Sequence, residues 1–124
     1  MSKETFGYLA DVPEEIRSGG RHSFGCILPK NMGSKGFSMG YHIMEPGGTN
    51  KNPDGTCHVH EVAQEAMFFI EGEGIATICD KEYAIKDGSF MLAPEGVPHS
   101  VSNTSKDKLL KFIWVYSPPS QSQC

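Results

Sequence analysis

The sequence has no long apolar run and no surplus of basic residues. Its longest apolar stretches are a few residues long, far short of the roughly 20 residues of a membrane-spanning helix. The formal net charge is −4 with histidine neutral, and no basic stripe marks a nucleic-acid surface. The opening residues, MSKETFGYLADVPEE, are polar and lack the apolar core of a signal peptide. We therefore expect a cytoplasmic protein that binds neither membrane nor nucleic acid.

Cysteine is sparse, and its spacing provides no paired motif. The four cysteines, at positions 26, 57, 79 and 124, form no CxxC pair, so we expect free thiols in a reducing compartment. Cys57 borders His58, but neighbours on an extended strand point to opposite sides, and we interpret Cys57 as a bystander. A chain of 124 residues fits one domain and can bury a core without disulfides.

Short strands with frequent turns dominate the pattern. Fourteen glycines and eight prolines interrupt the chain. Between them lie runs rich in β-forming residues, at 21–28, 36–45, 65–71, 74–79, 82–86, 89–93, 98–102 and 109–116. This arrangement predicts an all-β sandwich or barrel.

Outside these strands the sequence predicts little regular structure. The only helix we expect is a single turn near DVPEEIR, with Asp11 as its cap and Pro13 at its first position. We expect an N-terminal arm at 1–20, one β-domain at 21–119 and a flexible tail at 120–124.

The last predicted strand, LLKFIWVY at 109–116, indicates which of its faces is buried. Alternation divides it into one face with Phe112, Trp114 and Tyr116, and another with Leu109, Lys111, Ile113 and Val115. Because Lys111 should avoid the core, we expect the aromatic face to point inward. The apolar residues of the outer face then need a cover, either the N-terminal arm or a second subunit.

The segment HVHEVAQEAMFFIEGEG, at 58–74, groups residue types that bind metals. On a strand, His58 and His60 share one face, about 6–7 Å apart, and Glu65 follows after enough residues for a tight turn. Two imidazoles and a carboxylate form a mixed nitrogen and oxygen set that suits divalent Fe, Mn, Ni, Cu or Zn. The alternative is an exposed strand end with two histidines of no special role, so a decision requires a further ligand elsewhere.

The segment GSFMLAPEGVPHSVSN, at 88–103, provides that candidate ligand. An apolar strand stops at Pro94, the residues PEGVP reverse the chain, and His99 opens the next strand. Such a hairpin can return His99 to a position beside the first two histidines.

These two segments resemble the two motifs of the cupin superfamily. The first motif, G(X)5HXH(X)3–4E(X)6G, is matched from its first histidine onward at 58–72, and the second, G(X)5PXG(X)2H(X)3N, is matched at every defined position of 88–103. One departure is the opening glycine of the first motif, where Asn52 stands. Gly47 is its counterpart, which implies an inserted, turn-rich loop at 49–57 near the mouth of the barrel.

The resemblance implies a fold and a metal site. The fold would be a small antiparallel β-barrel or jelly roll of two sheets, often dimeric in this family, so we expect a homodimer. Carried over position by position, the ligands would be His58, His60, Glu65 and His99, holding one divalent transition metal per chain. Three histidines and one carboxylate leave open positions on an octahedral ion, as catalytic sites do.

The resemblance does not decide the reaction, because similar cupins act as dioxygenases, oxalate decarboxylases, isomerases, lyases and cyclases, and some only bind sugars. Alternation from the ligands places a largely apolar lining around the metal, formed by Met67, Phe69, Val101, Phe112 and Trp114. This lining suits a small organic substrate with an apolar body and one oxygen function at the metal, although each residue would also fit simple core packing. Met67 stands where lyases of dimethylsulfoniopropionate carry a tyrosine base, and no arginine falls on an inferred lining face. Lyase chemistry of that kind and oxalate-type chemistry are therefore disfavoured.

His42, in FSMGYHIME, lies on the predicted strand before the first motif. If His42 faces inward it is a candidate proton shuttle, and if Tyr41 faces inward its hydroxyl takes that place. The alternative is a histidine that is exposed or hydrogen-bonded in the wall. Our leading hypothesis is a metalloenzyme that oxidises a small organic molecule with O2. Metal-assisted isomerisation, cyclisation or decarboxylation comes second, and a non-catalytic binding protein is the third possibility.

Overall fold

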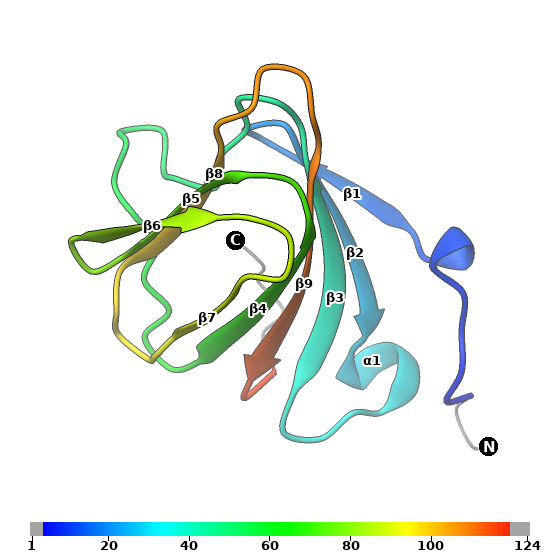
Figure 1. Ribbon diagram of the computed structural model, residues 1–124. Helices are drawn as coiled ribbons and strands as arrows, with labels where there is room; N and C mark the ends of the chain where they lie inside the picture. The colour runs from blue at the N-terminus through cyan, green and yellow to red at the C-terminus, as the bar shows by residue number, and fades with distance from the viewer. Residues whose placement is uncertain (1–3, 120–124) are drawn as a thin grey trace.

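The computed structural model describes residues 4–119, so the expected tail at 120–124 lies outside the described part. In chain order the elements are η1 (Leu9–Asp11), β1 (Glu14–Arg17), β2 (Arg21–Ile27), α1 (Pro29–Met32), β3 (Ser38–Met44), β4 (Gln64–Glu71), β5 (Gly74–Ile78), β6 (Lys81–Ile85), β7 (Phe90–Ala93), β8 (His99–Asn103) and β9 (Leu110–Ser117) (Figure 1). Neither helix within residues 4–119 has the length and apolar character needed to cross a membrane.

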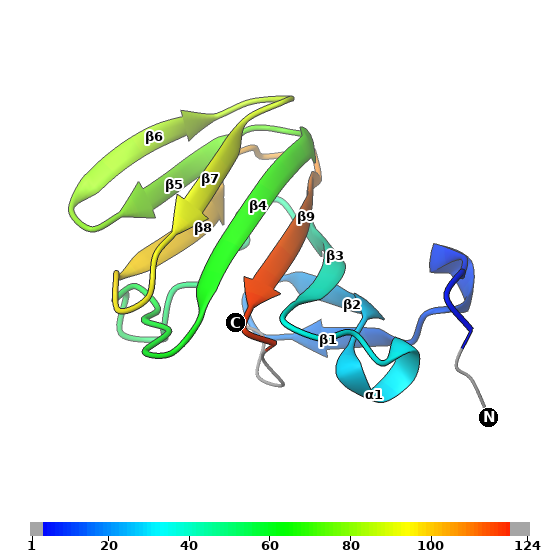
Figure 2. The ribbon, with the colours of Figure 1, turned by 90° about the horizontal axis from the view of Figure 1, so that it is seen from below.

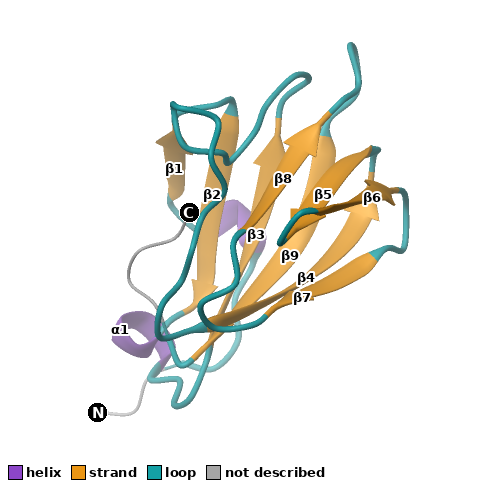
Figure 3. Cartoon of the chain, turned by 90° about the vertical axis from the view of Figure 1, so that its left-hand side faces the viewer, coloured by secondary structure: helices purple, strands orange, loops and turns teal. Residues whose placement is uncertain are grey.

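The strands form two antiparallel sheets. The larger sheet has the order β1-β2-β3-β9-β4-β7, and the smaller sheet has the order β6-β5-β8 (Figure 2). Ala76, Ile85 and Val101 of the smaller sheet pack in one core with buried residues of β3, β4 and β9. Strands are the main regular structure of the described chain, and its helices are short (Figure 3). The predicted all-β fold of two antiparallel sheets is confirmed, and the strand pairing within residues 4–119 makes it a sandwich rather than a closed barrel.

The register of the larger sheet arranges its inner face in rows of side chains. Directly paired residues of antiparallel strands share a face, so each row crosses several strands. The four rows are Ser38 with Tyr116 and Glu65; Gly40 with Trp114 and Met67; Ser23 with His42, Phe112 and Phe69; and Arg21 with Met44 and Leu110. The alternation of buried and more exposed positions along β3, β4 and β9 identifies this face as the buried one. Phe112, Trp114 and Tyr116 thus point inward, as predicted.

Gly40 lets the indole of Trp114 lie across β3. A Cβ atom at Gly40 would overlap the Trp114 ring and the carbonyl oxygen of Phe24. A side chain at this position would therefore force either the indole or strand β2 to move.

Residues 14–17 form strand β1, and the helical turn predicted near DVPEEIR is wrong. β1 pairs antiparallel with β2, from Glu14 opposite Phe24 to Arg17 opposite Arg21. The open edge of β2 offers hydrogen-bond partners to an extended backbone, and this tertiary pairing overrides the local helix-start signals.

His22 on β2 links β1 to the residue that follows β3. Its Nδ1 lies 2.6 Å from a carboxylate oxygen of Glu14, and its Nε2 lies 2.6 Å from one of Glu45. Ionised carboxylates only accept hydrogen bonds, so both ring nitrogens donate and the ring is an imidazolium. The hydrogen bonds to Glu45 and Glu14, in that order, raise the pKa of His22 above its ordinary 6.5. This clamp holds the start of β2, where the buried Arg21 stands.

The outer face of the larger sheet carries an exposed apolar patch. Its members on β4 and β7 are Phe68 (49% exposed), Ile70 (44%), Phe90 (80%) and Leu92 (51%). Phe68 pairs with both Phe90 and Ile113, so the patch continues onto β9, where Ile113 and Val115 are half-buried. The N-terminal arm lies against β2, α1 and β3 instead. Within the described residues nothing covers the patch, and a second subunit stays our prediction for its cover.

The His22 clamp should make stability depend on pH. Because the pKa of His22 is raised on folding, the clamp contributes fully below the unfolded value of 6.5 and is lost as the pH rises through the raised value. In urea unfolding across this window, the free energy of unfolding should fall more for the native protein than for His22→Gln, which cannot titrate. Equal pH slopes for the two proteins would contradict the clamp.

The outer apolar patch should mediate a homodimer. Light scattering should give about twice the chain mass of 13.6 kDa, because a two-fold contact buries the same patch on both subunits. Phe90→Glu should shift the protein toward monomer, whereas Tyr83→Glu, at an exposed aromatic residue on β6, should not. A native protein that stays monomeric at every concentration would rule the dimer out.

Candidate metal centre

Backbone hydrogen bonds bring the two histidine segments together. His58 and His99 exchange a pair of hydrogen bonds, N–H to carbonyl, each 2.8 Å long. The amide of Gly96 donates to the carbonyl oxygen of His60 at 2.8 Å, which ties the turn between β7 and β8 to the same segment. His60 and His99 are thereby fixed side by side, with their ring centroids 5.1 Å apart.

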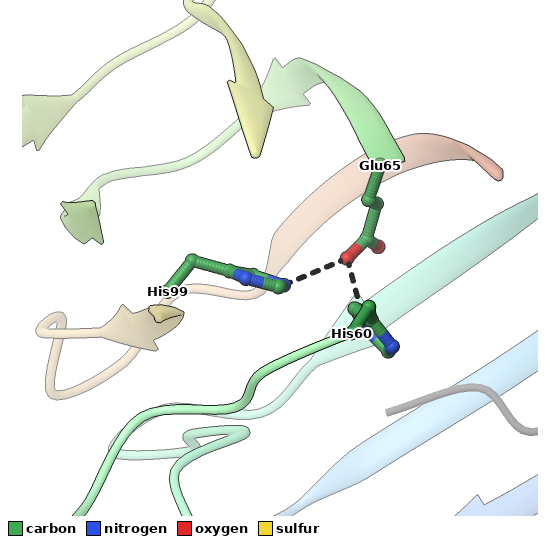
Figure 4. Close-up of side chains that lie close together, drawn as sticks. All are labelled: His60, Glu65 and His99. Atoms are coloured by element: carbon green, nitrogen blue, oxygen red, sulfur yellow. Dashed lines mark hydrogen bonds and ion pairs between the residues drawn. The ribbon is translucent and has the colours of Figure 1, made fainter. Parts of the chain in front are cut away.

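Glu65 completes the cluster from the start of β4. Its carboxylate is 3% exposed, and its Oε1 lies 3.1 Å from Nε2 of His99 and 3.7 Å from Nε2 of His60 (Figure 4). One ligand atom from each of these three side chains lies within 4.8 Å of the others. Figure 4 shows the two imidazoles and the carboxylate converging from separate parts of the chain.

The hydrogen bonding of His99 is consistent with a cation, either a proton or a metal ion, between its Nε2 and the Glu65 carboxylate. Its Nδ1 lies 3.1 Å from the carbonyl oxygen of Val97, and a carbonyl only accepts, so Nδ1 carries the proton. Nε2 and the Glu65 carboxylate can approach so closely only with a proton between them, which makes the ring an imidazolium, or with a metal ion between them, which leaves the ring neutral. Ligand atoms about 2.1 Å from one ion at a right angle are about 3 Å apart. The spacing of His99 and Glu65 therefore fits two ligands of one metal.

The carboxylate of Glu65 is held in its ionised form. Burial alone would raise the pKa of this carboxyl, but the hydrogen bonds and charges of His60 and His99 outweigh burial and hold the pKa below its usual range. An ionised carboxylate with two imidazoles is the mixed oxygen and nitrogen set expected of a transition-metal site.

His58 stands beside this cluster without joining it. Its ring centroid is 6.4 Å from those of both His60 and His99, and its buried Nε2 has no hydrogen-bond partner among the described residues. Burial first, and then the charge of Arg21, lower the pKa of His58 to about 4, so the ring is neutral at physiological pH and able to bind a metal. Its role as fourth ligand stays a prediction.

The five residues predicted to line the site are all buried in one hydrophobic cluster: Met67, Phe69, Val101, Phe112 and Trp114. Met67 and Phe69 also line a cleft of about 710 Å³ between β4–β7 and β5–β6, together with Ile85 and Met91. Met67 is the next inward residue after Glu65, so the cleft begins one row from the candidate ligands. Contact of any of these residues with a substrate stays a prediction.

His42 faces the interior, and Tyr41 faces outward. The ring of His42 is 4% exposed and stacks on Phe112, with centroids 4.9 Å apart and planes at 14°. Its buried Nε2 has no partner among the described residues. Burial, followed by the charge of Arg21, lowers the pKa of His42 to about 4, so the ring is neutral. Its role as a proton shuttle stays a prediction.

The sequence analysis missed an interior arginine. Arg21 is 7% exposed and occupies the inner face of β2, opposite the core residue Met44. The lining was inferred from β4, β8 and β9, which carry no arginine, so the expectation of a lining without arginine did not extend to β2. The sequence pattern of β2 did not identify its buried face, because the inner positions hold Arg21, Ser23 and Gly25, none of which is a typical core residue.

Residues 40–116 match the model of the cupin domain. This chain belongs to the cupin family. The cupin is 27% identical over 61 residues to an uncharacterized protein of Methanocaldococcus jannaschii, and that match covers 49% of each of the two chains.

Solved structures show the same fold. A RmlC-like cupin from Shewanella frigidimarina has a TM-score of 0.79 at 15% identity, with 96% of this chain and 95% of that chain covered. A predicted oxalate decarboxylase from Thermotoga maritima has a TM-score of 0.77 at 21% identity, with 91% of this chain and 98% of that chain covered. At such identities the likeness establishes the fold and leaves the chemistry to the site.

Loss of one histidine should empty the metal centre. The purified protein should hold about one divalent transition ion per chain, and His60→Ala or His99→Ala should lose most of it, since each removes a ligand from the set. His22→Ala is the matched control, because His22 contacts Glu14 and Glu45 on the opposite face of the sheet. Elemental analysis that finds full metal occupancy in both ligand mutants would end this hypothesis.

Proposed function

We propose that this cupin is a metal-dependent enzyme acting on a small organic molecule, with oxidation by O2 as its reaction. The observation that supports this most is the convergence of His60, Glu65 and His99, whose ligand atoms lie within 4.8 Å of one another in the protein interior. A structural zinc site is usually closed by four ligands from the protein. A set of three or four mixed ligands instead suits an ion that keeps positions for reactants.

The metal would be one divalent transition ion held by His60, Glu65 and His99, with His58 as fourth ligand. Iron, manganese, nickel, copper and zinc all accept this mixture of imidazole and carboxylate. When bound, such an ion supplies Lewis-acid character and, for all but zinc, redox chemistry. The chain itself supplies the ionised carboxylate, the neutral imidazoles and the exclusion of water.

The surroundings of the ligands favour an apolar substrate body. The cleft of about 710 Å³ begins at Met67 and is lined largely by apolar side chains of both sheets. A pocket of this kind buries most of a small ligand and keeps bulk water from the reacting atoms. In a dioxygenase reaction both atoms of O2 enter the substrate, so no further reductant is needed. This balance suits a small chain whose only expected cofactor is one metal ion.

A second candidate is a reaction in which the metal acts as a Lewis acid, such as decarboxylation, isomerisation or cyclisation. Two observations favour it. The fold is similar to that of a predicted oxalate decarboxylase, and Arg21 places a positive charge inside the sandwich, which would attract an acidic substrate. A protein that binds the same molecules without converting them is the remaining outcome.

Oxygen dependence separates these candidates. Protein loaded with Fe(II) should consume O2 when offered a panel of small organic acids and aromatic compounds, and His60→Ala should not. The same turnover under argon and in air would reject oxidation and promote the Lewis-acid reaction. Binding without any turnover under either gas would identify a non-catalytic protein.

Met67 should affect turnover without affecting the metal. Met67→Tyr adds a ring and a hydroxyl one row from Glu65, so kcat/KM should fall by about tenfold or more, which corresponds to roughly 1.4 kcal/mol, while metal content stays at the native level. Met67→Leu keeps the apolar volume and serves as the control. Unchanged kinetics in Met67→Tyr would remove Met67 from the substrate site.

A further inference from the structure

Three hydrogen-bond donors face the interior in successive rows that lead away from the metal centre. Trp114 is one row beyond the Glu65 row, His42 is two rows beyond it, and Arg21 is three rows beyond it. Their side chains are buried, at 2%, 4% and 7% exposure respectively. Neighbouring rows are roughly 7 Å apart along a strand. We call these three residues the donor track.

Two members of the donor track have hydrogen-bonding atoms that the described residues do not satisfy. Nε1 of Trp114 and Nε2 of His42 are buried, and neither has a partner within residues 4–119. An indole N–H only donates, and a neutral imidazole carries one N–H that can be placed on Nε2. A buried donor is unfavourable unless it is paired, so these two nitrogens call for an acceptor from outside the protein chain.

Arg21 gives this region a positive charge. Its Nε donates to the carbonyl oxygen of Ser18 at 2.8 Å, which orients the guanidinium from the β1–β2 turn. Arg21 is 7% exposed on the inner face of β2, one row beyond His42, and its charge adds to burial in lowering the pKa of His42. The guanidinium therefore places a positive charge at the His42 end of the donor track, away from the metal centre.

The donor track is chemically opposite to the apolar cleft. The cleft on the β5–β7 side is lined by residues such as Met67, Phe69 and Ile85, whereas the β2–β3 side presents donors and a cation. A divalent ion with one carboxylate among its ligands keeps a net positive charge, so both ends of the donor track attract an anion. Neutral polar ligands would not make use of this charge.

We propose that the donor track binds the carboxylate of an organic acid, with Arg21 and His42 as its principal contacts and Trp114 as an additional donor. The planar fork of a guanidinium matches a carboxylate better than a point charge does. This inference deepens the proposed function, on which it rests for the metal end of the substrate. It bears on the sequence-based expectation that oxalate-type chemistry is disfavoured, because that expectation rested on finding no arginine on an inferred lining face.

The test measures binding of acetate and benzoate, with acetamide and benzamide as neutral controls of the same shape. Isothermal titration calorimetry uses the zinc-loaded native protein, in which each acid should bind at least about tenfold more tightly than its amide. Arg21→Met, which keeps an unbranched side chain, should lose about tenfold in acid binding and leave metal content unchanged. Arg21→Lys should restore part of the affinity, since it restores the charge without the fork.

His42→Phe gives an independent measurement in case Arg21→Met does not fold. The phenyl ring keeps the stacking on Phe112 but has no N–H, so acid binding should weaken severalfold and metal content should stay native. Equal binding of acids and amides, or unchanged acid binding in both Arg21→Met and His42→Phe, would overturn the proposal. Tighter binding of inorganic phosphate than of either acid, dependent on Arg21, would overturn the assignment to a carboxylate.

The metal-free protein separates this inference from the proposed function. One outcome is that native protein holds no metal, and that benzoate binds to His60→Ala but not to the same variant carrying Arg21→Met. The donor track is then supported and the metalloenzyme is rejected. The other outcome is that native protein holds its metal but the affinity for the acid does not depend on Arg21. The donor track is then rejected and the metal centre is supported.

Discussion

An ionised carboxylate in a protein interior is the constraint on which this structure depends. Glu65 is 3% exposed, and moving such a charge out of water costs on the order of several kcal/mol unless cationic or donor groups receive it. Those groups come from His60, five residues before Glu65, and from His99, which is distant in sequence from both. The paired hydrogen bonds between His58 and His99, and the bond from Gly96 to His60, hold the receiving groups in place. Without them the carboxylate would have to take up a proton or leave the core.

Much of the centre could be predicted because its spacing is local. The distances from His60 to Glu65 and from Gly88 to His99 are set by one turn and one hairpin, and strand periodicity then fixes the direction of each side chain. His58 shows where this reasoning weakens. The argument that His58 and His60 share a face assumed a regular strand, but the structure has only an isolated bridge at His58. The His58 ring lies 6.4 Å from the His60 ring, close to the predicted separation, yet His58 is outside the group of three ligand atoms that converge.

Strands β1 and β2 could not be predicted as well, because their neighbours are distant in sequence. β1 exists only because β2 leaves an open edge, and the local sequence of DVPEEIR favours a helix start. On β2 the usual relation between hydrophobicity and burial is inverted, since Arg21 and Ser23 are buried while Phe24 lies on the other face. Pattern-based reasoning fails at such places because buried polar residues break the relation between hydrophobicity and burial on which it relies.

The inner face of the larger sheet changes from apolar at β4 to polar at β2, and β9 lies between these halves. Its inward residues Trp114 and Tyr116 are aromatic side chains that have both an apolar ring and a polar atom. The ring of Trp114 packs over Gly40, while the hydroxyl of Tyr116 lies 3.4 Å from Nε2 of His60. A purely aliphatic strand here would satisfy the apolar half alone, and a polar strand would weaken the core. Amphipathic aromatic residues on the central strand let one small sandwich place a candidate metal centre between an apolar cleft and a line of donors.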